Sequence, residues 1–201
     1  MIRLSLFVSL LALTVNAAAG TTAIVGGKVI TVGAQGTIEN GTVLIVDGGI
    51  AAVGDDVRVP AGADTIDASG KIVTPGLFAP LSQLGLVEVS LSAGPVDGEQ
   101  RGEHFTAGFD VADAYNPRST LIAVSRIEGI TRAVSAPSPA YPDESGAGHI
   151  IAGLAAVVNL GDSDAIEQRS AAVVVSLGES GSYFAGGTRA AAWLMLRNAL
   201  D

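Results

Sequence analysis

Three pairs of short β-prone runs, each joined by a turn rich in glycine, make up the first part of the chain. The paired runs are residues 23–25 and 28–31, residues 42–46 and 50–53, and residues 65–67 and 71–73. Two such runs around a short glycine-containing turn predict a β-hairpin. Residues 22–73 are therefore expected to form a small antiparallel sheet, or half of a sandwich, with one face that needs covering.

The pattern becomes helical in the middle of the chain. Asn116 is predicted to be an N-cap, Pro117 the first helical residue, and Gly129 the C-cap of the same helix. The apolar positions that fall roughly on one face of this helix are Leu121, Ile122, Val124 and Ile127. Such a face is expected to pack on a sheet.

Buried strands and a second helix are predicted for the remaining part. Apolar runs occupy residues 130–134, 149–160 and 171–177, and Thr188 precedes a helix that extends from Arg189 to the last residue. Apolar strands that alternate with helices favour parallel βα units over a second sandwich. So few strands and helices rarely close a core, and we expect the chain to end partway through a larger barrel or sheet.

The N-terminus has the pattern of a secretory signal peptide. Arg3 is followed by an apolar run at residues 4–15, which is too short to span a bilayer, and by small residues at 17–19. The alternative is a buried N-terminal helix. Cleavage would leave a secreted or periplasmic protein with no membrane span, since no later stretch is long and apolar enough for one. The chain has no cysteine, so thiol catalysis is excluded.

Composition and charge narrow the class of partner. The net charge is −9 and basic residues are scattered without a run or stripe. Nothing in this pattern attracts a phosphate backbone, so nucleic acid is not expected as a partner. A small-molecule ligand remains open, and the sequence does not specify an oligomeric state.

The first part of the chain contains five glycine-containing sequence segments that follow one another in a characteristic order. They are residues 27–31, 38–45, 47–54, 59–63 and 66–77. In order and spacing they resemble the start of the amidohydrolase family, especially its secreted imidazolonepropionase-like members. Residues 116–119 and 126–131 are also similar to this group, though less distinctively.

The resemblance implies an α/β architecture, in which a β-sandwich built from both ends of the chain lies beside a (β/α)8 barrel. After the signal peptide predicted at residues 1–19, it implies a β-sandwich subdomain at 20–74 and the first βα units of an incomplete barrel at 75–201. The first barrel strand would begin near Pro75 and end near residues 81–84. In such barrels the active site lies where the C-terminal ends of the strands meet.

The family's metal-ligand pattern is missing from this strand. In the family, the Pro-Gly-Leu that corresponds to residues 75–77 is followed by a hydrophobic residue, Asp, a small residue, and then His-x-His. Leu81 and Gln83 stand at the two histidine positions. Leucine has no ligand atom, and the neutral carboxamide of glutamine is a poor ligand for zinc or a similar divalent metal. We expect no metal cofactor in this chain, although zinc or another divalent metal is typical of the family.

The resemblance implies a hydrolase of non-peptide carbon–nitrogen bonds, in which a metal activates water. Without the His-x-His pair and the later ligands, the chain by itself is predicted to be inactive. The alternative is a non-catalytic homologue that uses the same fold to bind a ligand or partner.

Three other side chains are weak site candidates. His104 lies in an acidic region with Glu99, Asp110 and Asp113, which could hold a cation but fits a solvated loop better. His149 precedes an apolar run and fits a strand edge better than a metal ligand. Neither is placed beside a second histidine by the sequence.

Glu88 is the third candidate. On a predicted strand at residues 87–89 it would be the carboxylate closest to the barrel mouth, or else a side chain facing outward. Residues 178–181 lack the Gly-x-Ser-x-Gly spacing of a nucleophile elbow. Residues 186–188 could receive an anion at a helix start, but an ordinary N-cap at Thr188 explains them better.

Overall fold

The computed structural model describes residues 20–88, 96–100, 107–139, 148–161 and 165–201. The predicted signal peptide and His104 lie outside these ranges. The chain divides into two compact units between Pro75 and Gly76. Among the described helices, none has the length and hydropathy that crossing a bilayer requires.

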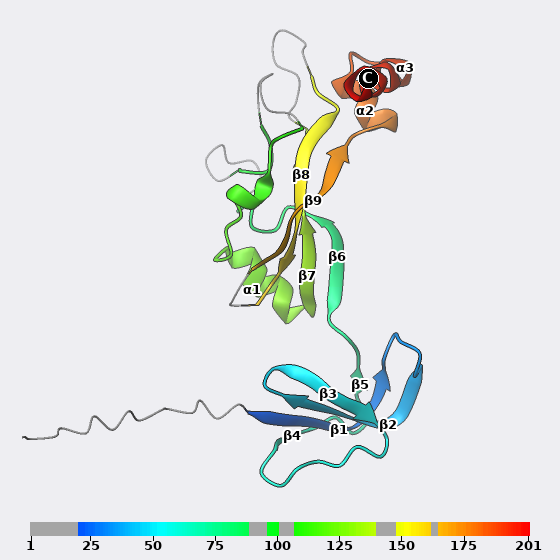
Figure 1. Cartoon of the computed structure of the whole chain (residues 1–201), viewed down its shortest axis with the longest axis vertical. Coiled ribbons are helices and arrows are strands. Elements are labelled where there is room, and N and C mark those ends of the chain that lie inside the picture. The colour runs from blue at the N-terminus through cyan, green and yellow to red at the C-terminus, as the bar shows by residue number, and fades with distance from the viewer. Residues whose placement is uncertain (1–19, 89–95, 101–106, 140–147, 162–164) are drawn as a thin grey trace, which may run out of the picture. The chain divides into compact units, whose positions relative to one another are not determined.

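The first unit is one mixed five-stranded sheet (Figure 1). Its strands are β1 (Thr21–Ile30), β2 (Thr37–Val46), β3 (Gly49–Gly54), β4 (Asp64–Asp67) and β5 (Ile72–Val73). The order is β3-β2-β1-β4, and β5 pairs with the second half of β1. The β2–β1 and β2–β3 pairs are antiparallel, whereas β4 and β5 run parallel to β1.

Residues 26–27 form an irregularity inside β1 and not the predicted hairpin turn. The strand continues through both glycines, and its pairing with β2 shifts register on either side of Gly27. Gly26 has a φ of 75°, and a Cβ at Gly27 would lie 2.9 Å from Cγ2 of Val73. Two glycines between β-prone runs are typical of a β-bulge as well as of a turn, so the sequence pattern did not separate the two structures.

The second predicted hairpin is confirmed. Val46 pairs with Gly49, and the two residues between them, Asp47 and Gly48, have φ values of 55° and 77°. Positive φ at both central positions defines the type I′ turn, which matches the twist of an antiparallel pair.

The third predicted hairpin is wrong. β4 pairs with the first half of β1 and β5 with its second half, so the two strands follow each other along one neighbour. The turn between them is closed by a hydrogen bond from Lys71 N to Ala68 O at 2.8 Å, and Ala68 N donates to Val25 O in β1. A Gly-rich turn therefore moves the chain forward along β1 here and does not reverse it.

The second unit contains a four-stranded sheet in the order β6-β7-β8-β9. The strands are β6 (Leu77–Ser82), β7 (Ile130–Ser135), β8 (Ile151–Asn159) and β9 (Ile166–Val175). β6 and β7 are parallel and are connected through the 3-10 helix η1 (Val111–Asp113) and helix α1 (Thr120–Ile127). This is the one βαβ unit among the described residues, and β6 lies where the sequence predicts the first strand of the second part.

β8 and β9 pair antiparallel with their neighbours, which corrects the prediction of parallel βα units. The sequence pattern was misleading because β8 is buried on both faces, as Ala155 and Ala156 show with exposures of 1% and 0%. Val111 and Ala112 of η1 pack on one of these faces in a shared core with Ala156 and Val158, while Leu154 N donates to Phe109 O at 2.7 Å in an isolated bridge. A strand covered on both sides has the continuous apolar sequence that is typical of parallel sheets. β9, predicted to be buried, is an edge strand with Val173 55% exposed.

Helix α1 begins three residues later than predicted. Ser119 is its N-cap and accepts a hydrogen bond from Leu121 N, while Asn116 instead accepts one from Arg118 N in the preceding turn. Of the four apolar residues predicted to pack, only Ile122 is buried, and Ile127 is 83% exposed.

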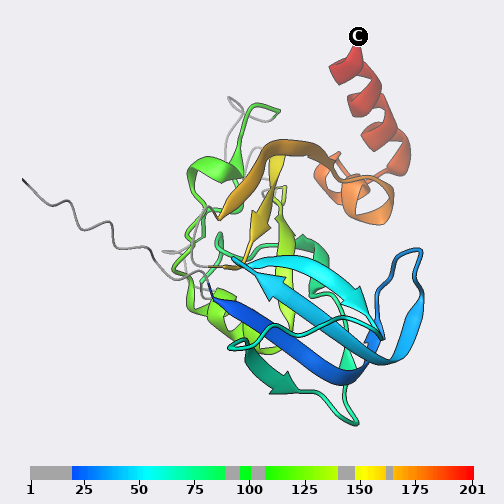
Figure 2. The ribbon, with the colours of Figure 1, turned by 60° about the horizontal axis from the view of Figure 1, so that its bottom comes forward.

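Helices α2 (Gly178–Phe184) and α3 (Arg189–Leu200) follow β9 and lie beyond its end (Figures 1 and 2). They pack on each other where Gly181 faces Ala192. The start of α3 is as predicted, because Thr188 accepts a hydrogen bond from Ala191 N at its N-cap.

The core of the second unit lies between the sheet and the βα connection. Its buried members are Leu86, Val111, Ala112, Tyr115, Ile122, Ala133, Ala156, Val158 and Leu160. They come from β7, β8, α1, η1 and the turn after β6, so this core fixes the C-terminal ends of β6 and β7 against the connection.

Candidate functional site

The C-terminal ends of β6 and β7 lie side by side, with Ser82 paired to Ser135. Leu81, the residue before Ser82, is 71% exposed. The side chain of Gln83 is also exposed, and its Nε2 donates to Oγ of Ser138 at 3.1 Å. Gln83 therefore uses its amide nitrogen in a contact between two segments that are far apart in sequence.

Serine hydroxyls cross-connect the two strand ends. Ser82 Oγ donates to the backbone oxygen of Val134 at 3.0 Å, and Ser135 Oγ donates to the backbone oxygen of Leu84 at 2.7 Å. A backbone bond from Ala136 N to Ser82 O, at 2.9 Å, lies between them. We call Ser82, Gln83, Ser135 and Ser138 the strand-end cluster.

The strand-end cluster also reaches the segment at residues 96–98. Ser138 N donates to Gly98 O at 2.8 Å, and Asp97 N donates to Leu86 O at 2.7 Å. A Cβ at Gly98 would lie 3.0 Å from Nε2 of Gln83, so glycine gives the amide room to lie against the backbone. Three segments of the chain thus converge at the end of β6.

Glu88 does not lie on the predicted strand. Val87 makes an isolated bridge with Val96, and Glu88 follows it in a bend. Its carboxylate accepts hydrogen bonds from Asn116 Nδ2 at 2.8 Å and from Ser119 Oγ at 2.9 Å. A negative charge beside the N-terminus of α1 is favourable, so the geometry gives Glu88 the role of fixing the start of that helix.

His149 makes no hydrogen bond with the strand-end cluster. It is half-buried and lies two residues before Ile151, the first residue of β8. Because β7 and β8 are antiparallel, this end of β8 is at the same edge of the sheet as the end of β7.

The acidic residues near His104 are engaged with β9. Arg169 forms an ion pair with Asp113, and Asp110 Oδ2 accepts a hydrogen bond from Ser170 Oγ at 3.0 Å. Asp110 also accepts one from Ala112 N, as the N-cap of η1. The hydrogen bond and charge of Asp113 raise the pKa of Arg169. Asp110 and Asp113 thus connect η1 to β9.

The residues at the strand ends do not fit a catalytic divalent metal. Leu81 offers no ligand atom, and Gln83 offers only a neutral carboxamide oxygen, since its amide nitrogen donates to Ser138. Glu88, the nearest carboxylate in sequence, is taken up by α1. Nowhere in the described ranges do three side chains of His, Cys, Asp or Glu come together as a metal would require.

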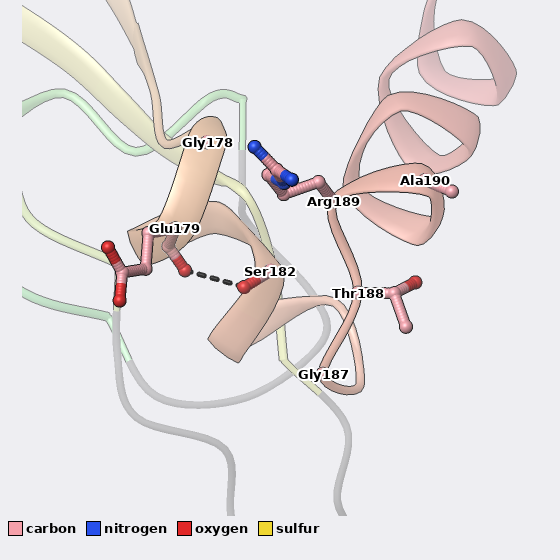
Figure 3. A pocket seen from close by; sticks show the side chains of 7 residues that line it. All are labelled: Gly178, Glu179, Ser182, Gly187, Thr188, Arg189 and Ala190. Carbon is pink, nitrogen blue, oxygen red and sulfur yellow. Dashed lines mark hydrogen bonds between the residues drawn. The ribbon is translucent and has the colours of Figure 1, made fainter.

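A separate polar hollow lies between α2 and α3 (Figure 3). It has a volume of about 710 Å³ and is lined by Gly178, Glu179, Ser182, Gly187, Thr188, Arg189 and Ala190. Both Gly-containing stretches singled out in this part of the sequence contribute to it. Ser182 Oγ donates to the backbone oxygen of Glu179 at 2.6 Å, and Thr188 caps α3, so both hydroxyls are engaged with backbone groups.

A second hollow of about 430 Å³ lies at the opposite end of β7. Arg126, Ile130, Thr131, Arg132, Asn159, Leu160 and Gly161 line it. Arg132 is held by the carboxylate of Glu167, with its Nε 2.9 Å from Oε1. The positive charge of Arg132 in this hollow is therefore neutralised by Glu167, and the hollow lies away from the strand-end cluster.

Sequence reasoning located Leu81 and Gln83 at the end of β6 but missed the serines. Their partners are 51 and 52 residues away along the chain. The available signal was the position of Ser82 and Ser135, each at the last residue of a strand.

Comparisons with known proteins give two useful matches. No protein-family model matches the chain. A dihydroorotase from Geobacter metallireducens is 48% identical over 53 residues, which is 26% of this chain and 12% of that protein. The structure of an amidohydrolase from Thermotoga maritima superposes with a TM-score of 0.73 at 21% identity, over 89% of this chain and 46% of its own. A D-hydantoinase structure is 36% identical over 38% of this chain and 15% of its own, with a TM-score of 0.30.

The chain thus spans less than half of the Thermotoga amidohydrolase and a smaller part of the dihydroorotase. At 21% identity the structural match establishes fold and not activity. Both matches support the amidohydrolase resemblance of the sequence. Over the part that the two share, the chain has the fold of the Thermotoga amidohydrolase.

Proposed function

We propose that this chain is an exported amidohydrolase-family protein of the imidazolonepropionase-like kind, and that its own residues do not carry metal-dependent hydrolysis. The fold shared with the Thermotoga amidohydrolase and the local match to the dihydroorotase support the family. By that resemblance, the activity of the family is hydrolysis of non-peptide carbon–nitrogen bonds.

The observation that carries the proposal is the contact between Gln83 and Ser138. At the two places where the resemblance expects histidines, Leu81 is an exposed hydrocarbon and Gln83 donates its amide to a neighbouring hydroxyl. Only the carboxamide oxygen of Gln83 could bind a metal, and this neutral oxygen is a weak ligand for zinc. No step of hydrolysis is assigned to these residues.

Metal binding and turnover test the proposal together. The full chain is purified, incubated with excess zinc, passed through a desalting column and analysed for bound metal and for hydrolysis of cyclic amides. An active dihydroorotase is the positive control for the assay. We expect less than one tightly held zinc ion per chain and no turnover. One zinc ion per chain with hydrolysis of an amide or lactam would overturn the proposal.

A binding role is the second candidate, and the surface of β6 favours it. Leu77, Phe78 and Leu81 on this edge strand are each at least half exposed. A non-catalytic homologue could use such a surface for a ligand or partner. The reading frame after codon 201 discriminates the two: further His and Asp codons at barrel-strand ends favour hydrolysis, and their absence favours binding.

Export is proposed from the first residues. Arg3, the apolar run at 4–15 and the alanines at 17–19 support a cleavable signal peptide. Expression of the full chain in a Gram-negative host and mass spectrometry of the periplasmic fraction test this. The expected product begins at Gly20, and an uncleaved cytoplasmic chain would contradict it.

A further inference from the structure

The pairing of β6 with β7 is interrupted shortly before the two strands end. Register shifts between Ala79 and Ser82, and Pro80 lies inside this interval. Proline has no backbone N–H, so it cannot donate to a sheet ladder. The ends of a parallel pair that carry the strand-end cluster must therefore be held by something other than a continuous ladder.

The serine hydroxyls provide hydrogen bonds just beyond this interruption. Each strand end donates a side-chain bond to the other: Ser82 to Val134 O at 3.0 Å, and Ser135 to Leu84 O at 2.7 Å. The two bonds lie on either side of the backbone bond from Ala136 N to Ser82 O. The arrangement is reciprocal, so the two strand ends cannot separate without losing both the serine side-chain bonds and the backbone bond.

Burial makes these bonds important. Ser135 is 0% exposed and lies among core residues such as Ala133 and Ala156. A buried hydroxyl without a partner is costly, and hydrogen bonds away from water are stronger than exposed ones. Alanine would fill the same space without a polar atom, so the hydroxyl is explained by the bond that it makes.

The exposed part of the cluster extends the same connection outward. Gln83 donates to Ser138 Oγ, and Ser138 N donates to Gly98 O. The segment at residues 96–98 is thereby joined to the ends of both strands.

We propose that Ser82 and Ser135 are positioning residues that lock the ends of β6 and β7 together, and that Gln83 and Ser138 extend this lock to residues 96–98. The hydrogen bonds organise this end of the sheet without a metal ion. The inference goes beyond the proposed function, because it concerns how the strand ends are held and stands whether or not the protein hydrolyses a substrate.

Amide hydrogen exchange of the full chain tests the lock. The amides of Ala136 and Ser138 report on it, since Ala136 N bonds to Ser82 O across the strand ends and Ser138 N bonds to Gly98 O. Loss of one hydrogen bond corresponds to about a 2- to 10-fold change in an opening equilibrium. We expect Ser82→Ala to speed exchange at Ala136 by about this factor, and Ser82→Thr, which keeps the hydroxyl, to restore the original rate.

A matched control separates this effect from general loss of a serine. Ser182→Ala removes a hydroxyl that donates to Glu179 O in α2 of the same unit. It is expected to leave exchange at Ala136 and Ser138 unchanged. Gln83→Ala is expected to speed exchange at Ser138 more than at Ala136, because Gln83 contacts Ser138 directly.

A double-mutant cycle and a chelator complete the test. Ser82→Ala and Ser135→Ala are expected to be non-additive in the exchange rate of Ala136, since both bonds hold one junction. If Ser135→Ala does not fold, the Ser82 variants still decide. Unchanged exchange in Ser82→Ala overturns the lock. Faster exchange at Ala136 on adding EDTA to the wild-type chain also overturns it, because a metal would then hold the strand ends.

Discussion

The ring of Tyr115 lies directly against the backbone of Gly85. A Cβ built on Gly85 would lie 2.6 Å from Cδ2 of the ring and 3.1 Å from the backbone oxygen of Asn116. Gly85 also has a φ of 78°, and its backbone oxygen accepts a hydrogen bond from Asn116 N at 2.8 Å. The turn after β6 is thus held to the βα connection by contacts that only glycine permits.

Gly85→Ala is expected to destabilise the second unit by about 2–3 kcal/mol, from strain at positive φ and from overlap with the ring. Chemical denaturation followed by Trp193 fluorescence measures it. Gly129→Ala is the control, because Gly129 has a φ of 88° and nothing within 4 Å of an added Cβ. That variant should lose about 1–2 kcal/mol, for the backbone strain alone. Equal losses in the two variants would show that the ring contact has no energetic weight.

Tyr115→Phe is expected to leave stability unchanged or raise it by up to about 1 kcal/mol. The hydroxyl of Tyr115 is buried and meets no hydrogen-bond partner among the described residues. Phenylalanine keeps the ring against Gly85 and removes the hydroxyl, which folding buries away from water. Thermal unfolding measures the change, and a loss of more than 1 kcal/mol would show that the hydroxyl has a partner.

Alkaline pH is expected to weaken the second unit through the same side chain. Burial raises the pKa of Tyr115. The stability of the second unit is therefore unaffected by this group below the ordinary tyrosine pKa of about 10, and it falls as pH rises from there towards the folded-state pKa, because the unfolded chain ionises first. Denaturation of the wild type and of Tyr115→Phe between pH 9 and 11, about the range in which tyrosine titrates, measures this. A parallel decline of both proteins would contradict the assignment.

Glu88→Ala is expected to cost about 1–2 kcal/mol, because the Ser119 hydroxyl and the Asn116 amide lose their shared acceptor. Faster amide exchange in the first turn of α1 should accompany the loss. Glu39→Ala is the matched control, since Glu39 makes an exposed ion pair with Lys28 at 2.8 Å. Removing such a pair should cost less than about 1 kcal/mol. Similar losses would show that Glu88 does not support the helix.

Restoring both histidines, as in Leu81→His with Gln83→His, is expected to give only weak zinc binding. The two side chains would lie on the same side of the chain at the end of β6, but a catalytic zinc site needs about three protein ligands. Calorimetric titration with zinc measures the affinity, and each single variant is a control. Tight binding that survives a chelator would show that other residues already complete a metal site.

Local signals in the sequence predicted the elements whose structure depends on neighbouring residues. The turn at Asp47 and Gly48 and the N-cap at Thr188 are of this kind, because dihedral preference and capping act within a few residues. The hairpin predicted for β4 and β5 was wrong, because both strands pair with β1, which lies far away in the sequence and which their local residues do not specify. β8 was assigned to a parallel unit because burial on both faces leaves the same apolar pattern in either orientation.

The candidate site shows the same division. The sequence placed Leu81 and Gln83 at the end of the first strand of the second part, and β6 ends at Ser82. It did not reveal that Gln83 bonds to Ser138, because Ser138 lies 55 residues further along the chain. Serine is common in loops and at strand ends, so its role follows only from the acceptor that the fold brings to it.

The division of the chain at Pro75 has a spectroscopic consequence. Residues 20–75 contain no phenylalanine, tyrosine or tryptophan, and the single tryptophan of the chain, Trp193, lies in the second unit. Intrinsic fluorescence and near-ultraviolet absorbance therefore record unfolding of the second unit and are blind to the first. Unfolding of the mixed sheet by a substitution at Gly27 would not be recorded directly by either signal. Far-ultraviolet circular dichroism or peptide-resolved mass spectrometry is needed to see that half of the protein.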